Sequence, residues 1–368
     1  MKTKKMTQRS ESMSKNRELT ALMVGDVYVR RDDPPSVFQH VKDLLRSADF
    51  MLGNLEGSVA DSGCAREKAG AEAWKADARQ MAAVEIAGFH AMTVANNHMM
   101  DYGHEALLET LSNLDRLGVK HTGGGRNFAE AHAPAVVERE GCKVALLGYT
   151  SVFMDGWEAG PQSPGLAVMR AHTSYQPPAR YFEAPGSPPI IHSWVSPQHK
   201  SQLSADVAAA RKHADIVICT FHWGVSAGFK KLTEYQMELG RHAIDAGADL
   251  VFGHHPHVMQ GIEVYKGRPI FYSLGNFTFA RHNAAKGHEL ETMIIRCRIR
   301  DRQVHTVEFL PARCDVALNP HALDLETGRD VIAIVKERSA QFGTQLDAHG
   351  DAVRVIIDLQ RAETPQAA

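Results

Sequence analysis

The feature that most constrains this chain is a repeated pattern in which a short apolar run ends in polar side chains able to bind a metal ion. The clearest case follows the apolar run 248–252, where His254, His255 and His257 lie close together. Side chains two positions apart on extended backbone point to the same side, so His255 and His257 can converge on one point. Imidazole is a common ligand of divalent metals, whereas a hydrogen-bonded histidine-rich loop is the alternative for this motif alone.

Four other apolar runs end in the same way. The runs are 19–24, 49–52, 91–95 and 216–220, and the polar residues that follow them are Asp26, then Asn54 and Glu56, then Asn97 and His98, and finally His222. Each of these residues alone has an ordinary explanation as a turn or helix-cap residue. A metal site, however, needs ligands from several elements, and positions just past strand ends are common site positions in α/β folds. Five such strand ends in succession therefore predict one metal centre.

His98 is the candidate acid–base residue of this centre. Asp101 follows it closely enough to orient the imidazole and fix its tautomer, which would make both residues catalytic. The alternative is that the asparagines before His98 cap a helix predicted over 105–117. The candidate substrate-binding residues are Asn54, Arg31, Trp223 and His254, and a solvated surface position is the alternative for Arg31.

The composition is that of an ordinary globular protein. With 368 residues, 44% of them hydrophobic, the chain can bury a large core, and a net charge of -2 gives no support for binding to nucleic acid or to a membrane. Its five cysteines include no C-x-x-C pair and fit a reduced, cytoplasmic protein. The polar N-terminus contains no apolar run long enough for a signal peptide or a membrane span, so we expect residues 1–18 to be a disordered leader.

We expect one main domain over residues 19–315. Within it, the segment 151–200 is rich in proline and aromatic residues but lacks periodicity, which predicts an irregular, lid-like excursion over the mouth of the site. Residues 316–368 are expected to form a C-terminal helical extension, with a helix over 331–341 and a frayed tail. The sequence gives no indication of the oligomeric state.

The motifs at the strand ends resemble those of the CapA-like (poly-γ-glutamate capsule synthesis) family of the calcineurin-like metallophosphoesterase superfamily. The resemblance covers about residues 20–280. It implies an α/β fold of the metallophosphoesterase type, a four-layer α/β/β/α sandwich in which two mixed sheets are flanked by helices and the metals lie at strand ends. The segments that carry the resemblance are Gly-Asp-Val at 25–27, Gly-Asn-Leu-Glu at 53–56, Ala-Asn-Asn-His-Met-Met-Asp-Tyr-Gly at 95–103, His-Trp-Gly at 222–224, Gly-His-His-Pro-His-Val-Met-Gln at 253–260 and Tyr-Ser-Leu-Gly-Asn-Phe at 272–277.

The resemblance also implies a set of metal ligands, and the sequence differs from the family's motifs at two positions. Tyr28 stands where the superfamily's first motif has histidine, and Glu56 replaces the aspartate of the second motif. One metal position thereby loses an imidazole and gains carboxylate character, which favours harder ions. We expect one or two divalent ions, Mn²⁺ in first place, with Mg²⁺, Ca²⁺, Fe²⁺ and Zn²⁺ left open. The implied ligands are Asp26, Glu56, Asn97, His222, His255 and His257, with His98 as their acid–base partner.

Three functions are left open. The first is a metal-dependent hydrolase that uses metal-activated water on a small anionic or peptide-like substrate, either a phosphoester or a γ-glutamyl-type amide. The second is an epimerase or isomerase, in which His98 abstracts a proton beside a metal-polarised carbonyl. The third is a non-catalytic accessory role in poly-γ-glutamate capsule synthesis, as the family name implies.

Overall fold

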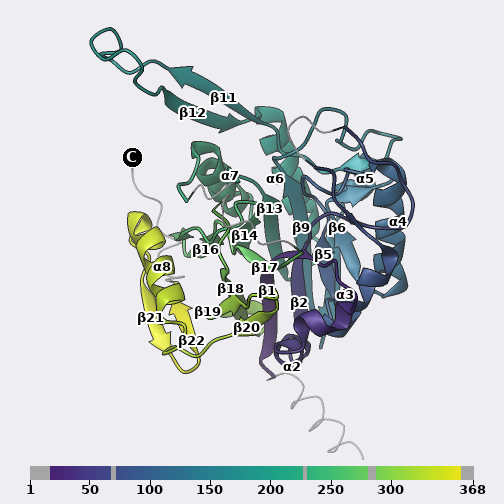
Figure 1. Ribbon diagram of the computed structural model, residues 1–368. Helices are drawn as coiled ribbons and strands as arrows, with labels where there is room; N and C mark the ends of the chain where they lie inside the picture. Colours follow the sequence, from purple (N-terminus) through teal and green to yellow (C-terminus); the bar gives the residue numbers. More distant parts are fainter. Residues whose placement is uncertain (1–16, 68–71, 227–229, 281–286, 358–368) are drawn as a thin grey trace, which may run out of the picture.

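Two mixed β-sheets lie face to face, and helices cover the outer face of each sheet (Figure 1). The computed structural model describes residues 17–67, 72–226, 230–280 and 287–357. Most of the predicted leader and the end of the predicted tail lie outside these described residues. The predicted four-layer α/β/β/α sandwich is confirmed by this arrangement of sheets and helices.

The larger sheet has ten strands. Its main path consists of β21 (Leu346–His349), β22 (Ala352–Val355), β19 (Gln303–Cys314), β18 (Glu291–Arg300), β1 (Leu19–Tyr28), β2 (Phe50–Leu55), β5 (Ala91–Thr93) and β6 (Lys120–Thr122), while β17 (Asn276–Phe279) lies beside β1 and β20 (Pro320–Ala322) beside β19. Strands β1, β2, β5 and β6 run parallel. Their carboxyl ends therefore meet at one edge of the sheet.

The smaller sheet has six strands. Their order is β15 (Ile262–Tyr265), β16 (Arg268–Phe271), β14 (Leu250–His254), β13 (Ile216–His222), β9 (Cys142–Thr150) and β8 (Ala135–Arg139). The four central strands β16, β14, β13 and β9 are parallel, and β15 and β8 are antiparallel at the two edges. The carboxyl ends of β13 and β14 thus also lie together.

The helices divide between the two sheets. Helices α2 (Lys42–Arg46), α3 (Met81–Ala87) and α4 (Gly103–Arg116) belong to the layer outside the larger sheet, α6 (Pro197–Arg211) and α7 (Glu234–Asp245) to the layer outside the smaller one, and α8 (Arg329–Ser339) packs on β15 and β19. Shorter elements fill the connections, namely η1 (Pro34–Phe38), β3 (Ser58–Val59), β4 (Lys75–Ala76), η2 (Ala78–Gln80), β7 (Gly124–Gly125), α5 (Phe128–Ala131), β10 (Gly165–Leu166) and η4 (Ala340–Phe342).

Alternate side chains of the central strands enter different cores. In β1, Met23 packs in the core between the two sheets, whereas Val24 packs in the core under α3 and α4. In β13, Ile218 belongs to the core between the sheets and Cys219 to the core under α6 and α7. Both faces of these strands are buried, which is why the sequence shows them as continuous apolar runs.

The segment 151–200 is more regular than predicted. Strands β11 (Ala171–Gln176) and β12 (Ile190–Val195) form an antiparallel hairpin that projects from the body of the molecule (Figure 1). Carboxylates of Glu234 and Glu238 on α7 accept hydrogen bonds from backbone amides of β12 and hold the base of the hairpin. The structure therefore corrects the expectation of an irregular segment, and the role as a lid stays a prediction. Most of the hairpin side chains are exposed, so its sequence carries none of the apolar alternation that marks a half-buried strand.

The C-terminal extension contributes strands as well as a helix. Helix α8 lies close to the range predicted for it, but β22 also pairs with β19 and β21 pairs with β22, so both extend the larger sheet. Each of these strands has four residues, too few to show a periodic pattern in the sequence. In the ranges that the structure describes, no helix combines the length and apolarity required to cross a membrane.

Candidate metal centre

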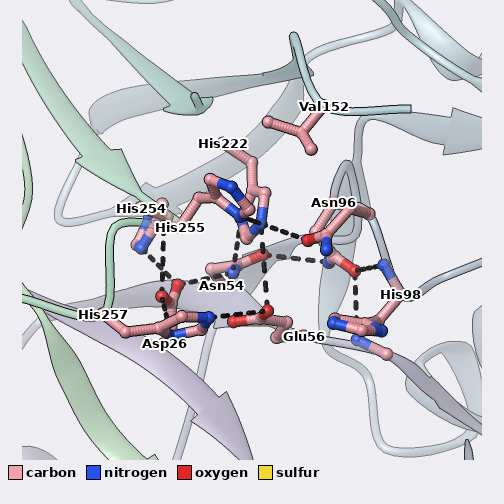
Figure 2. A network of polar contacts seen from close by, with 12 residues as sticks. Asp26, Asn54, Glu56, Asn96, His98, Val152, His222, His254, His255 and His257 are labelled. Carbon is pink, nitrogen blue, oxygen red and sulfur yellow. Dashed lines mark hydrogen bonds and ion pairs between the residues drawn. The ribbon is translucent and has the colours of Figure 1, made fainter. Parts of the chain in front are cut away.

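The candidate metal centre lies where the carboxyl ends of the parallel strands of both sheets meet (Figure 2). Asp26 is near the end of β1, and Glu56 follows β2 directly. From the smaller sheet, His222 ends β13, and His255 and His257 follow β14. The two sheets thus each contribute side chains to one cluster, as the repeated strand-end pattern predicts.

Asp26 is completely buried and surrounded by donors. Its Oδ1 lies 2.9 Å from His254 Nδ1 and accepts a hydrogen bond from Asn54 Nδ2 at 2.8 Å. Its Oδ2 accepts the backbone N–H of His255 at 3.2 Å. Burial alone would raise the pKa of Asp26, but the imidazoles of His254 and His222 hold that pKa well below its ordinary value. The side chain is therefore an ionised carboxylate inside the protein.

Glu56 supplies a second buried carboxylate. Its Oε1 lies 3.8 Å from His222 Nε2 and 3.9 Å from His257 Nε2. One ligand atom from each of Asp26, Glu56 and His257 lies within 4.8 Å of the other two. Two ligand atoms bound to one ion at about 2.0–2.2 Å are separated by roughly 3–4 Å, so a small contraction of this cluster suffices to bind one. The residues present therefore fit a divalent metal.

His222 links the two halves of the cluster. Its Nε2 lies 2.7 Å from Asn97 Oδ1 and 3.1 Å from His255 Nδ1. Burial, reinforced by the neighbouring His255, lowers the pKa of His222 well below its ordinary value. The imidazole is therefore neutral at physiological pH, which is the form that binds metal ions.

The backbone that carries the last two histidines is strained. His255 has φ 94° and His257 has φ 56°, both in the left-handed region that residues other than glycine rarely adopt. Such positions cost on the order of 1–3 kcal/mol each and persist where surrounding contacts hold them, often at functional sites. One of these contacts is made at His257, whose Nδ1 lies 2.8 Å from Asn276 Oδ1.

His98 and Asp101 form a buried pair beside the metal cluster. His98 Nδ1 lies 2.7 Å from Asp101 Oδ2, which also accepts the backbone N–H of Trp74 at 2.8 Å. The Trp74 ring stacks on the His98 imidazole, with ring centroids 3.7 Å apart. A proton on Nδ1 is thereby directed to the carboxylate, which leaves Nε2 for chemistry. The sequence gives no signal for Trp74, because it lies in a segment without periodicity.

Asn96 is a second residue that sequence reasoning missed. Its Nδ2 donates to Asn54 Oδ1 at 3.2 Å and to the Leu55 carbonyl at 2.8 Å. Its Oδ1 accepts the backbone N–H groups of Gly57 and His98. Asn96 therefore ties the end of β2 to the loop that carries His98 and does not cap helix α4. The neighbouring pair of asparagines in the sequence was its only signal.

The structure does not bring Trp223 to the cluster. Its indole is fully buried in the core under α6 and α7, and Nε1 donates to the Tyr272 carbonyl at 2.7 Å. The physical reason is the alternation of an extended chain, since the residue after His222 points to the opposite face. The expected substrate contact is therefore corrected to a core residue.

The guanidinium of Arg31 is bound to the loop 315–321 and not to the cluster. It donates to Asn319 Oδ1 at 2.7 Å and to the Ala317 carbonyl at 3.0 Å, which corrects its expected role in substrate binding. The other two predicted substrate residues, Asn54 and His254, do reach the cluster. Both are fully buried against Asp26, where they orient the carboxylate.

Two cavities lie next to the strand β1 end of the site, and Arg30 lines both. The smaller, of about 180 Å³, is also lined by Tyr28 and Phe279, and the Phe279 ring lies 4.9 Å from the His257 ring. The larger, of about 320 Å³, is lined by the cationic side chains Arg30 and Lys75 and by the carboxylates Asp61 and Asp77. Arg30 and Arg31 both line the smaller cavity, whose wall residue Phe279 packs against the ring of His257.

Comparison of the sequence with protein families gives a match to a family model and to several relatives. A family model described as bacterial capsule synthesis protein PGA_cap matches residues 11–281. The capsule biosynthesis protein CapA of Bacillus anthracis is 29% identical over 83% of this chain and 71% of that protein. The PGA biosynthesis protein CapA of Bacillus subtilis is 30% identical over 71% of this chain and 63% of that protein. A probable polyglutamine synthesis accessory protein of Mycobacterium tuberculosis is 28% identical over 54% of this chain and 47% of that protein.

Comparison with solved structures gives more distant similarities. A hypothetical protein from Thermus thermophilus is 15% identical with a TM-score of 0.48 and covers 80% of this chain and 98% of that one. The calcineurin-like phosphoesterase YfkN from Bacillus subtilis is 13% identical with a TM-score of 0.42 and covers 86% of this chain and 96% of that one.

Proposed function

Because this chain belongs to the bacterial capsule synthesis protein family PGA_cap, we propose that it is a divalent-metal-dependent hydrolase acting on an anionic substrate, a γ-glutamyl-type amide or a phosphoester. The observation that carries the proposal is the meeting of two buried carboxylates, Asp26 and Glu56, with His257. The pair His98 and Asp101 stands beside them as a proton donor. The names of the Bacillus relatives support a substrate of the capsule-polymer class.

The metal would be held by the side chains that the structure gathers at the strand ends. A bound divalent ion would polarise a substrate oxygen and lower the pKa of water toward neutrality. The mixture of carboxylate, amide and imidazole donors suits Mn²⁺ first, with Mg²⁺, Ca²⁺, Fe²⁺ and Zn²⁺ as further candidates. The residues proposed to hold one or two ions are Asp26, Glu56, Asn97, His222, His255 and His257.

His98 is proposed to protonate the leaving group. Asp101 accepts from Nδ1 and fixes the ring, so the proton that His98 would deliver is a second one, taken up on Nε2 when the ring becomes an imidazolium. Trp74 covers one face of the imidazole and therefore sets the plane in which that proton can be delivered. Arg30, which lines the cavities next to the site, is proposed to bind a negative charge of the substrate.

A second candidate function is a non-catalytic accessory role in polymer synthesis. The relative from Mycobacterium tuberculosis with accessory protein in its name favours this role. An accessory protein can use the same metal to bind a polyanion without hydrolysing it. The two candidates differ in turnover and agree in metal content.

The test measures metal content and turnover in the same preparations. We would compare the wild type with Glu56→Ala and His257→Ala, and use the exposed residue His349 for a matched control, His349→Ala. The substrates are poly-γ-glutamate, p-nitrophenyl phosphate and its bis ester, each with Mn²⁺. We expect metal and hydrolysis in the wild type and the control, and loss of both in the two site variants.

Other outcomes separate the alternatives. Metal binding without hydrolysis of any of these substrates, together with retention of poly-γ-glutamate, would favour the accessory role. Exchange of substrate hydrogen for deuterium in D₂O without hydrolysis would favour proton abstraction. Equal metal content in the wild type and in both site variants would contradict the assignment of the metal centre.

A further inference from the structure

A second cluster of metal-binding side chains lies outside the central site. It consists of His40, Asp315 and His321, and one ligand atom from each lies within 4.8 Å of the other two. His40 follows η1 near the start of the chain, whereas Asp315 follows β19 and His321 lies in β20. The cluster therefore joins two segments that are far apart in the sequence.

Asp315 is held rigidly by its own turn. Its Oδ1 accepts the backbone N–H of Ala317 at 2.8 Å and of Asn319 at 2.9 Å, and its Oδ2 accepts Asn319 Nδ2 at 3.0 Å. A carboxylate that is oriented by outer hydrogen bonds is organised in the way that metal ligands are.

The two imidazoles lie close to this carboxylate. His321 Nε2 is 3.2 Å from Asp315 Oδ2. Ligand atoms bound at about 2.0–2.1 Å to one tetrahedral ion are separated by roughly 3.3 Å, so this pair already has the spacing of two ligands. The His40 ring stacks on the His321 ring, with centroids 4.2 Å apart, and is exposed. Rotation of the exposed His40 side chain can therefore bring its nitrogen to the same ion.

We propose that His40, Asp315 and His321 form a second divalent-metal site, distinct from the central one and suited to Zn²⁺. Two imidazoles and one carboxylate form a donor set that a borderline ion such as Zn²⁺ prefers, and water completes the tetrahedron. Asp315 and His321 lie beyond residue 281, where the family match ends. The site thus joins His40, which lies within the family match, to two residues that lie beyond it.

The expected role of this second site is to brace the central one. The loop between Asp315 and His321 is already joined to β17, because Thr278 Oγ1 donates to the Leu318 carbonyl at 2.9 Å. The same short strand begins with Asn276, which contacts the central ligand His257. An ion that fixes the loop to His40 therefore supports the strand that positions His257.

The test counts bound zinc in the full-length chain. Zn²⁺ is titrated against a chromophoric chelator, and the metal retained after gel filtration is measured by ICP-MS. We expect His40→Ala and His321→Ala each to lose about one equivalent relative to the wild type. The control His349→Ala removes an exposed histidine of the C-terminal extension and should retain the wild-type content.

A variant of the central site distinguishes metal bound there from metal bound at the second site. Glu56→Ala should lose central metal and still bind the zinc that depends on His321, so the double variant Glu56→Ala/His321→Ala should bind about one equivalent less than Glu56→Ala alone. Unchanged zinc content in His40→Ala and His321→Ala, with circular dichroism like that of the wild type, would overturn the second site. A wild type that hydrolyses none of the substrates would contradict the proposed function only, because the readout for the second site is metal content.

Discussion

The imidazole of His98 lies flat against the indole of Trp74, with 9° between the ring planes and 3.7 Å between the ring centroids. The backbone N–H of the same tryptophan donates to Asp101 Oδ2, the atom that also contacts His98 Nδ1. Trp74 thus contacts both members of the proposed proton-donating pair, one through its side chain and the other through its backbone. Its two roles can be separated by substitution.

Trp74→Leu removes the stacking surface and keeps the backbone N–H. An aromatic contact of this kind contributes about 0.5–1.5 kcal/mol, so we expect kcat to fall by up to about 10-fold. The metal content should stay at the wild-type value, because the stacking partner His98 is not a proposed metal ligand. Steady-state kinetics and ICP-MS on the same sample provide the measurement. Partial recovery in Trp74→Phe is the control, and an unchanged kcat in Trp74→Leu would contradict the positioning role.

Asp101→Asn tests the tautomer of His98. The amide can donate to Nδ1, which favours the neutral tautomer protonated only on Nε2, and it no longer stabilises the imidazolium that would donate the proton. We expect kcat to fall by about 10²–10⁴-fold, the range that general acid–base catalysis supplies. The fall in rate at high pH, which reports deprotonation of the proton donor, should disappear from the pH–rate profile of the variant. The metal content should be unchanged. A variant that loses metal as well as activity would show that Asp101 supports the metal centre and not the proton donor alone.

Arg30 and Arg31 are neighbours with different surroundings. Arg30 lines both cavities beside the site, whereas Arg31 lines only the smaller one, and its guanidinium is bound to Asn319 and Ala317. We expect Arg30→Ala to raise KM for an anionic substrate by about 10-fold with little change in kcat, because one charge-assisted contact is lost. Arg31→Ala is the matched control and should lower the free energy of unfolding without raising KM. The reverse pattern would restore the substrate role expected for Arg31 from sequence.

The strand-end pattern predicted much of the central site because both sheets are parallel where the site lies. Asp26, Glu56 and His222 each follow a buried apolar run, and parallel strands bring such ends to one edge. The pattern says where a side chain lies along the strand. The direction in which the side chain points alternates from one residue to the next along the strand. Trp223 follows His222 directly and therefore points into the core.

Residues without a local pattern could not be predicted. Trp74 reaches His98 only through the folded path of an irregular segment, and His40 meets His321 only because β20 pairs with β19. Strands β21 and β22 are short, and the pairing of β22 with β19 and of β21 with β22 is decided by tertiary packing. Sequence periodicity therefore does not predict the contacts between segments that are far apart in the chain.

The projecting hairpin provides a test of the lid expected at 151–200. Replacing residues 177–189 by Asn-Gly would join Gln176 directly to Ile190 through a two-residue turn, which matches their cross-strand pairing. Because the hairpin projects from the body (Figure 1), we expect turnover and metal content to stay within about 2-fold of the wild type. A loss of kcat beyond about 10²-fold in a folded variant would support a lid. A variant that keeps the tip and carries Tyr181→Ser is the control for the exposed aromatic side chain alone.

Asp315 predicts a specific pH dependence of stability. Its pKa of about 2 in the folded protein lies below the ordinary value of 3.8. Partial burial alone would raise this pKa, but hydrogen bonds from Asn319, His321 and Ala317 favour the charged form. A carboxyl group whose pKa is lower in the folded state stabilises that state at pH values above its pKa in the unfolded chain. This contribution is lost as the pH falls from about 4 toward 2. In metal-free protein, the free energy of unfolding of Asp315→Asn should therefore lie below that of the wild type at pH 7, with the difference shrinking below about pH 4. Urea unfolding at a series of pH values measures it, and Asp347→Asn on exposed β21 is the control. A difference that stays constant down to about pH 3 would show that the turn does not depend on the charge of Asp315.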